Sequence, residues 1–410
     1  MKKTVIIAAI LATTIGRSQQ VDDMISVQPS YTNQVYYSFE NGEVSNIDNS
    51  DWELAFDVSA FGSSIRTNGQ NGIELYTTPF DTTNWMSIDT AGMSNWTLNL
   101  DSDKSWSQGA FNVDYDASNA LDLGWGLYST ITHHITGNKT FILKYSDGSI
   151  KKVWIKLLAS GEYKFSYSDL DNTNATETTI QKSTYSGKNF VYYSLSNDLL
   201  IDREPAAEDW DILFTKYITE YAPGFPYAVT GVLLNNGTEA YLDETVETNT
   251  AIFNSSTVFE SDINTIGYNW KTFDMGSFTY VLDDSATYFI KTVEGDIWSM
   301  GFTDFGGSST GNIEFTVEQI ESANLDNNSF TSITTYPNPV SNELHINSSQ
   351  KGEASVSLYN VNGQEVDKQI FEFNGMSLIY NVAKYNEGIY ILTIQFENGE
   401  VINEKIIIKK

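Results

Sequence analysis

The chain has 410 residues, no cysteine and a formal net charge of −30. The lack of thiols excludes disulfides, thiolate metal sites, a cysteine nucleophile and lipid attachment through an N-terminal cysteine. A surface this acidic repels phosphate backbones and anionic lipids, so we expect neither nucleic acid nor a membrane surface as a direct partner. The 24 Tyr, 22 Phe and 9 Trp residues, beside much Thr, Ser, Asn and Gly, predict an all-β protein of strands and tight turns.

The N-terminus has the pattern of a secretory signal peptide. A basic start over residues 1–3 is followed by an apolar run over residues 5–15 and a polar exit near Ser18. The apolar run is too short to span a bilayer and no later stretch of the chain is longer, so no transmembrane segment is expected. We therefore predict a signal peptide over residues 1–18 and a mature protein that is secreted or displayed on the outer cell surface.

The middle of the chain alternates apolar and polar residues, which predicts short strands separated by turns. The clearest segments are Val35–Phe39, Trp52–Phe56, Phe141–Tyr145 and Val153–Leu157. Dipeptides such as Asn41-Gly42 supply the tight turns that join antiparallel strands. We therefore expect antiparallel sheets.

A pair of these segments occurs twice. Val35–Phe39 followed by Asp51–Phe56 recurs as Val191–Leu195 followed by Asp209–Phe214. The copies lie about 155 residues apart, which is too long a period for a solenoid. The repetition predicts two tandem antiparallel β domains of one fold.

These domains are expected over residues 30–168 and 185–320. Polar stretches over residues 169–184 and 321–332 lack the apolar side chains needed for packing. We therefore predict that both stretches are linkers.

The last part of the chain, residues 333–410, predicts a small C-terminal β-sandwich. It opens on Thr335-Tyr336-Pro337-Asn338-Pro339, continues through short strands with a turn at Asn362-Gly363, and contains Glu387–Leu392 near its end. Together these motifs resemble the C-terminal sorting domain of the type IX secretion system of Bacteroidetes. The resemblance implies passage through the outer membrane by the type IX secretion machinery, followed by release or surface anchoring.

Each repeat resembles the HmuY-like family of haem-binding β proteins. The resemblance lies in Tyr37-Ser38-Phe39 with Gly42-Glu43-Val44, in the strand Trp52–Phe56 and in Ile65–Gly69; the second repeat has Val229–Val232 where the first has its Arg-Thr-Asn-Gly run. The family implies capture of haem between two axial ligands, commonly histidines and in some relatives methionines. Its members are usually lipoproteins, and here the sorting tail would replace the lipid anchor.

The resemblance also implies where haem ligands would lie. His133 and His134 fall in the stretch that carries one family ligand, but the spacing to the following strand places that ligand position near Leu127 or Thr130. In the second repeat the same spacing falls on Met275. The family's other ligand lies in loops corresponding to residues 100–112 and 240–260, which contain no histidine or methionine. The candidate haem ligands are therefore Met275, His133 and His134. Haem is the only cofactor that the resemblance implies, and haem iron is the only metal.

Each of these residues also has a structural interpretation. A His-His pair in a polar turn is commonly exposed, and Met275 among aromatic residues is commonly part of a core or a pocket wall. Arg66, in its Thr-Asn-Gly context, is expected to form a buried or half-buried salt bridge that holds a hairpin.

No enzyme is expected, because the sequence lacks a Gly-x-Ser-x-Gly nucleophile motif, a His-Glu-x-x-His zinc motif and a glycine-rich phosphate loop. The leading hypothesis is a ligand-binding protein of the HmuY-like type for haem or a related small apolar ligand. The alternative is an adhesin or glycan-binding protein, since an acidic surface and many Trp and Tyr residues suit sugars; a purely structural surface protein is a third possibility. A deep apolar cleft favours the first hypothesis, and a shallow exposed platform favours the second.

Overall fold

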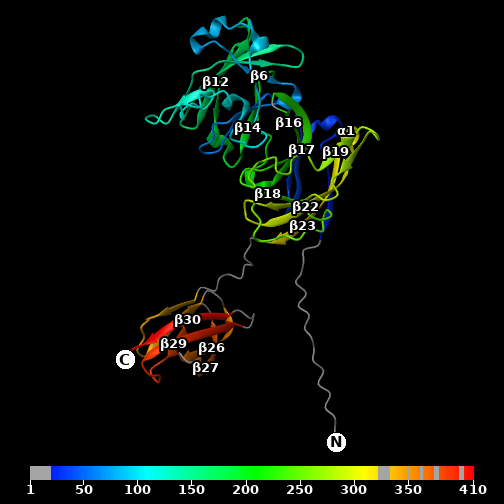
Figure 1. Cartoon of the computed structure of the whole chain (residues 1–410). Coiled ribbons are helices and arrows are strands. Elements are labelled where there is room, and N and C mark those ends of the chain that lie inside the picture. Colours follow the sequence, from blue (N-terminus) through cyan, green and yellow to red (C-terminus); the bar gives the residue numbers. More distant parts are fainter. Residues whose placement is uncertain are drawn as a thin grey trace. The chain divides into compact units, whose positions relative to one another are not determined.

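The computed structural model describes residues 20–222, 224–321, 333–348, 351–360, 363–373, 378–396 and 401–410. The chain divides into two units between Ala323 and Asn324, and each is described by itself. The predicted signal peptide and nearly all of the predicted second linker lie outside the described residues. The all-β prediction is confirmed: within the described ranges the only α-helix is α1, Gly307–Thr310 (Figure 1).

The first unit contains two lobes, each with its own apolar core. We call residues 52–201 the first lobe. Its strands are β4 (Leu54–Asp57), β5 (Ile65–Thr67), β6 (Glu74–Thr77), β7 (Leu98–Asn99), β8 (Gly126–Tyr128), β9 (Ile135–Gly137), β10 (Phe141–Lys144), β11 (Ile150–Ala159), β12 (Glu162–Asp169), β13 (Thr176–Gln181), β14 (Phe190–Ser194) and β15 (Leu199–Ile201).

We call residues 21–48 together with 210–321 the second lobe. Its strands are β1 (Val21–Ser26), β2 (Asn33–Ser38), β3 (Gly42–Asp48), β16 (Ile212–Ala222), β17 (Phe225–Leu234), β18 (Glu239–Asp243), β19 (Lys271–Asp274), β20 (Thr279–Leu282), β21 (Thr287–Lys291), β22 (Ile297–Phe305) and β23 (Asn312–Glu321).

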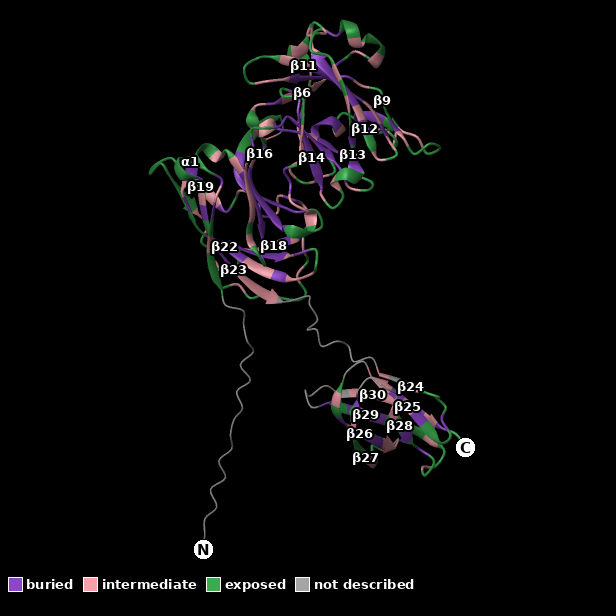
Figure 2. Ribbon diagram, turned by 180° about the vertical axis from the view of Figure 1, so that it is seen from behind, coloured by how far each residue is buried: buried purple, intermediate pink, exposed green. Residues whose placement is uncertain are grey.

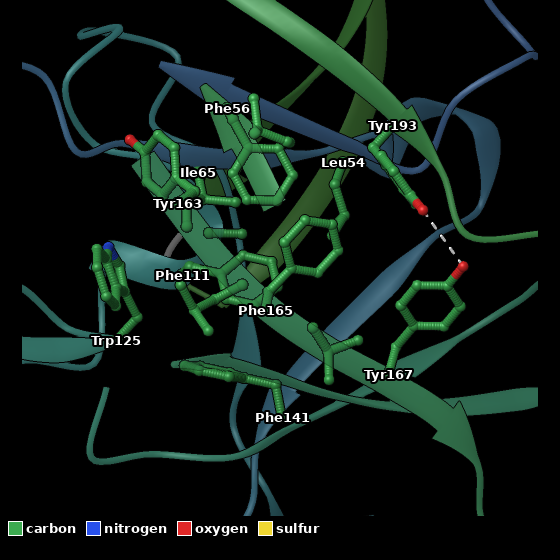
Figure 3. Close-up of a cluster of buried hydrophobic side chains, with 14 of the residues drawn as sticks. Leu54, Phe56, Ile65, Phe111, Trp125, Phe141, Tyr163, Phe165, Tyr167 and Tyr193 are labelled. Atoms are coloured by element: carbon green, nitrogen blue, oxygen red, sulfur yellow. Dashed lines mark hydrogen bonds between the residues drawn. The ribbon is translucent and has the colours of Figure 1, made fainter. Parts of the chain in front are cut away.

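Aromatic side chains from two sheets fill the core of the first lobe (Figure 3). One sheet has the order β13-β12-β11-β10-β6-β7, with β8 and β9 attached, and the other has the order β15-β14-β4-β5. Phe56 of the smaller sheet lies 4.9 Å from Phe165 of the larger one, and Phe111 lies 4.6 Å from Phe141, measured between ring centroids. Burial of these rings is the main force that holds the two sheets together. Buried residues follow the strands, whereas many of the connecting loops are exposed (Figure 2).

The second lobe repeats this arrangement with the sheets β1-β23-β22-β21-β18 and β17-β16-β2-β3. Its core includes Tyr37, Phe214 and Phe315, and Trp270 stacks on Phe302 with ring centroids 3.8 Å apart. The hairpin of β19 and β20 forms a separate two-stranded sheet. The antiparallel sheets of the all-β prediction are therefore present in two lobes of the same arrangement, but the lobes do not coincide with the predicted domains, residues 30–168 and 185–320.

The two sequence repeats exchange strands. Strand β2 of the first repeat pairs with β16 of the second, whereas β14 of the second repeat pairs with β4 of the first. In the larger sheets β1 pairs with β23, and β13 pairs with β12. Each lobe thus takes its opening strands from the start of the other repeat. The N-terminal segment over residues 21–48 completes the second lobe.

The predicted first linker, residues 169–184, is largely structured, which corrects that prediction. Strand β13 pairs with β12 along its whole length, from Glu162 opposite Gln181 to Tyr167 opposite Thr176. A strand at the edge of a sheet needs few apolar residues because one of its faces is open to solvent. Here the buried side chain of Ile180 supplies the contact with the core.

The second unit is a small β-sandwich, as predicted. Its first sheet has the order β24-β25-β28 and its second has the order β27-β26-β29-β30. The strands are β24 (Ile333–Tyr336), β25 (Glu343–Ser348), β26 (Gly352–Asn360), β27 (Glu365–Phe373), β28 (Leu378–Asn381), β29 (Gly388–Phe396) and β30 (Val401–Ile408). Side chains from both sheets, such as Leu344 and Leu392, are fully buried between them.

Candidate binding site

The junction between the lobes is built from equivalent residues of the two repeats. Tyr36 and Tyr192 occupy the same position of the repeat, and their hydroxyl oxygens lie 3.3 Å apart. Trp52 meets the ring of Tyr192 edge-on at 4.9 Å, and its counterpart Trp210 meets Tyr36 in the same way at 5.0 Å. The repeated Tyr-Tyr and Asp-Trp motifs therefore pack against each other as well as within their own sheets.

Two charged residues of the connection between β15 and β16 are buried at this junction. The guanidinium of Arg203 donates to Asp51 Oδ1 at 3.0 Å and to the carbonyl oxygen of Asp48 at 2.6 Å, and it lies 5.3 Å from the ring centroid of Tyr192. Arg203 thus ties this connection to the one between β3 and β4. No local pattern in the sequence predicts this role, because the partners of Arg203 lie about 150 positions earlier in the chain.

Glu204 is the second buried charged residue. Its carboxylate accepts hydrogen bonds from the backbone nitrogen of Asn189 and from the hydroxyl of Tyr192, each at 3.0 Å. Burial raises the pKa of Glu204 to about 7, since an apolar environment disfavours the charged form and the two hydrogen bonds only partly offset this cost.

The loop over residues 100–112 enters the junction from the first lobe. The indole nitrogen of Trp106 donates to the carbonyl oxygen of Leu234 in the second lobe at 2.8 Å. Arg66 positions this loop: its guanidinium donates to the carbonyl oxygens of Ser102 at 2.7 Å and Ser105 at 3.0 Å, and lies 5.0 Å from the Trp106 ring centroid. In the HmuY-like family this loop would carry a haem ligand, whereas here it joins the lobes.

Arg66 also forms the predicted half-buried salt bridge, with its Nε 4.0 Å from Asp101 Oδ1. Burial raises the pKa of Asp101, while Arg66 and the backbone nitrogens of Ala110 and Thr67 oppose that shift. The contacts of Arg66 hold the loop rather than the hairpin that contains it. In the second lobe the position of Arg66 is occupied by Leu233. Arg66 of β5 pairs with Ala55 of β4, and Leu233 of β17 pairs with the equivalent residue of β16, Leu213.

That register corrects the sequence comparison of Arg66–Gly69 with Val229–Val232. Asn68 corresponds to Asn235, and each side-chain amide donates to two backbone carbonyl oxygens. Asn68 donates to the carbonyl oxygens of Asn49 and Trp52 at 2.7 and 2.9 Å. Asn235 donates to the carbonyl oxygens of Ala207 and Trp210 at 2.7 and 2.6 Å.

A groove of about 690 Å³ opens beside the junction. The first lobe supplies most of its wall, and β16 of the second lobe supplies the rest. Its lining residues are mainly hydroxyl, amide and carboxylate side chains with one tryptophan: Thr77, Thr78, Asn95, Trp96, Thr97, Asn99, Asp101, Ser102, Asp103, Asp114, Thr219 and Glu220, with Pro79, Leu98, Leu100, Val113 and Ile218 as the apolar members. The groove is polar and, among its described lining residues, contains no lysine or arginine.

Asp103 fixes the two walls of the groove relative to each other. Its Oδ2 atom accepts hydrogen bonds from Thr219 Oγ1 at 2.6 Å and from Asn264 Nδ2 at 3.0 Å, both in the second lobe. A carboxylate that accepts from two donors across the lobes holds the groove in a defined width.

A small cavity of about 70 Å³ adjoins the groove and shares Asn99, Leu100 and Asp103 with it. Aromatic side chains line this cavity, including Trp52, Trp106, Phe190, Tyr192 and Tyr217. The hydroxyl of Tyr217 is buried and has no hydrogen-bond partner within the described ranges. Such a group is costly to leave unpaired, so it marks the cavity as a place where a polar ligand atom could be accommodated.

The structure does not bring the three predicted haem ligands together. Met275 lies in the turn between β19 and β20 of the second lobe and is 71% exposed, so the interpretation of Met275 as a core residue is wrong. His133 and His134 lie between β8 and β9 of the first lobe and line a separate cavity of about 400 Å³. His133 is exposed, and its Nδ1 lies 2.8 Å from the hydroxyl of Tyr128.

No group of three or more His, Asp or Glu residues in the described part of the chain is placed to hold a metal ion. In the same part of the chain, no helix is long and apolar enough to cross a membrane.

Among the comparisons with known proteins, a family match is found for the C-terminal tail and not for the two lobes. None of the curated proteins matches the chain. Among solved structures, the dimeric latent form of PorU from Porphyromonas gingivalis is 9% identical, over 84% of this chain and 31% of that one, with a TM-score of 0.16. A polysaccharide lyase is 8% identical, over 88% and 40%, with a TM-score of 0.15. A fungal alcohol oxidase in complex with copper is 12% identical, over 96% and 99%, also with a TM-score of 0.15.

The chain thus spans about a third of the length of PorU and two fifths of the length of the lyase. Structural agreement at these TM-scores carries no argument about this chain. The HmuY-like resemblance of the two repeats stays a prediction, since the matching family model covers only the tail. Residues 334–409 match the family described as secretion system C-terminal sorting domain, so the C-terminal unit is a type IX secretion sorting domain, which implies export to the cell surface or the medium.

Proposed function

We propose that this protein is an exported, non-enzymatic binding protein that holds a glycan in the groove at the lobe junction. The observation that carries the proposal is the groove itself, about 690 Å³ in volume and lined by hydroxyl, amide and carboxylate side chains with Trp96 among them. Sugars present many hydroxyl groups that both donate and accept, and this set of side chains offers partners of both kinds. An aromatic ring adds a surface for the apolar face of a sugar ring.

The groove favours a polar ligand over an apolar one. A flat apolar molecule gains most of its binding energy from burial in an apolar cleft. Here carboxylates such as Asp101, Asp114 and Glu220 lie along the groove, and the cavity beside it that contains most of the aromatic rings measures only about 70 Å³. The alternative raised from the sequence, a glycan-binding surface protein, is therefore preferred over the HmuY-like function.

Binding of soluble oligosaccharides to the mature full-length protein tests the proposal. A glycan array identifies the ligand, and isothermal titration gives its affinity. We expect Trp96→Ala to weaken binding by tenfold or more, because the substitution removes the tryptophan of the groove. Trp85→Ala is the matched control, since Trp85 lies in the same lobe but outside the groove lining, and it should bind as the wild type does.

Two results would overturn the proposal. One is an array on which the correctly folded protein captures no glycan. The other is equal affinity of the Trp96→Ala and wild-type proteins for every glycan captured.

Haem remains a second candidate, favoured by one observation: His133 and His134 line a cavity of about 400 Å³ together with Phe61 and Lys182. A histidine beside a cavity can ligate haem iron from one side. A haemin titration should then give a shifted Soret band that is lost in the His133→Ala/His134→Ala double variant and kept in Met275→Ala. A titration without any shift, in both oxidised and reduced haem, removes this candidate.

A further inference from the structure

Strand β16, which supplies the second lobe's wall of the groove, extends beyond the groove. Ile218, Thr219 and Glu220 of β16 line the groove, and the next residue of the strand is Tyr221. The hairpin then returns through Phe225 and Tyr227 of β17. Tyr221 is 78% exposed and Tyr227 is 60% exposed, so two large aromatic side chains continue the line of the groove into solvent.

The pairing of the two strands shows which face of the hairpin these rings occupy. Tyr227 is the direct cross-strand partner of Thr219. Side chains of directly paired residues project from the same face of an antiparallel ladder. Thr219 faces the groove, since its hydroxyl donates to Asp103 at 2.6 Å. The ring of Tyr227 therefore lies on the groove side of the hairpin.

Tyr221 joins this surface. The register of the hairpin shifts between Glu220 and Ala222, so Tyr221 is the residue at the bulge. Its ring centroid lies 6.4 Å from that of Tyr227, with the ring planes at 59°. A bulge re-aims a side chain, and here it brings two exposed tyrosines together at the mouth of a polar groove.

We propose that Tyr221 and Tyr227 form an aromatic platform that extends the groove, and that the ligand is a neutral oligosaccharide chain rather than a single sugar. The inference rests on the proposed function and specifies its ligand. One part of the chain occupies the groove, and the sugar rings that follow it stack their C–H faces on the tyrosines, whose hydroxyls can also bond to sugar hydroxyls.

The charges around the groove select against anionic chains. Asp101, Asp103, Asp114 and Glu220 line it, and its described lining residues include no cation. Asp101 pairs with Arg66 and Asp114 with Lys139, whereas Asp103 and Glu220 form no ion pair in the described part of the chain. A uronate or a sulfated sugar would lie close to these two unbalanced carboxylates. The ligand class is therefore a neutral chain, long enough to reach from Trp96 to the tip of the hairpin.

Affinity as a function of chain length tests the platform. The mature full-length protein is titrated with neutral oligosaccharides of two to eight units and with sulfated chains of the same length. We expect affinity to rise with length in the wild type. In Tyr221→Ala/Tyr227→Ala, the longest chains should bind roughly tenfold or more weakly, while the disaccharide binds as before.

The control is Phe278→Ala. Phe278 is 72% exposed near the tip of the other protruding hairpin of the same lobe, outside the groove lining. Its removal should leave the length dependence unchanged. All three positions are solvent-exposed, so their substitution is expected to preserve the fold, which a denaturation curve verifies.

The outcomes separate the platform from the groove. If the double variant keeps the full length dependence while Trp96→Ala loses binding, the platform is wrong and the groove stands. If sulfated chains bind as tightly as neutral ones, the neutral ligand class is wrong. If the wild-type protein binds none of the chains, the proposed function fails and the platform fails with it.

Discussion

Trp106 lies where three parts of the molecule meet: the loop over residues 100–112, the guanidinium of Arg66 and the carbonyl group of Leu234. We expect Trp106→Ala to lower the free energy of unfolding by about 3 kcal/mol, because it removes a hydrogen bond and the ring contacts between the lobes. Chemical denaturation measures the loss. Phe61→Ala is the control, since Phe61 is fully exposed and its removal should change stability by less than about 0.5 kcal/mol. Equal stability of the two variants would contradict the role of Trp106.

Glu204 makes stability depend on pH. Its pKa is raised to about 7 in the folded protein from an ordinary value of 4.5, so the folded state binds the proton more tightly than the unfolded state. Stability therefore falls as pH rises from about 5 to about 8, by roughly 3 kcal/mol at most. In Glu204→Gln the fall should become smaller by this amount, because the amide stays neutral, while Asp211, whose pKa burial raises to about 6, keeps its own share of the pH dependence. Denaturation curves of both proteins at pH 5, 6, 7 and 8 provide the comparison, and parallel pH dependences would rule out Glu204 as the source.

Single residues also show which contacts could be predicted from the sequence and which could not. The salt bridge of Arg66 was predictable because arginine is rare in this chain and Arg66 lies among residues typical of a turn. Its contact with Trp106 was not, since the two residues are 40 positions apart and no local pattern links them. The aromatic neighbours of Met275 in the sequence predict a buried side chain, yet the hairpin of β19 and β20 exposes side chains that an interior strand would bury.

Each lobe has an asparagine that secures the turn before β4 or before β16, close to Trp52 or Trp210. Asn68 and Asn235 are almost fully buried, and each donates to two backbone carbonyls. Asn68→Ala should cost about 2 kcal/mol, because two buried acceptors lose their donor, and Asn235→Ala should cost more, because Asn235 Oδ1 also accepts from Asn189 Nδ2 at 2.8 Å. Thermal or urea unfolding measures both. Asn71→Ala, at an exposed position, should be near neutral; an Asn68→Ala or Asn235→Ala variant as stable as Asn71→Ala would contradict this role.

Strand positions were well predicted at the scale of elements, and strand partners were not. Val35–Phe39 and Val191–Leu195 read as strands because their apolar residues and aromatics are local properties of the sequence. Which sheet each strand enters depends on contacts between residues far apart in the chain, such as Tyr37 with Ile212. The same limit explains β13, whose polar composition is typical of a linker but also suits an edge strand.

The N-terminal segment is required to complete the second lobe. Strand β1 covers the edge of β23, and β2 pairs with β16, so deletion of residues 20–48 leaves β23 and β16 each with one unpaired edge. We expect the deletion variant to lose the unfolding transition of the second lobe and to keep that of the first. Addition of a synthetic peptide of residues 20–48 should restore it, measured by tryptophan fluorescence and near-ultraviolet circular dichroism. A deletion variant that unfolds like the wild type would contradict this dependence.

The exchange of opening strands between the repeats bears on how such a chain could arise. If each repeat kept its strands to itself, duplication of one repeat would give two independent domains joined end to end. Here the pairings of β2 with β16 and of β14 with β4 are those that two separate copies of one repeat would make across a twofold axis. A strand-swapped homodimer of a single repeat would have this same arrangement. A single repeat, residues 20–175, should accordingly assemble as a dimer in solution, with a mass by light scattering twice that of the fragment.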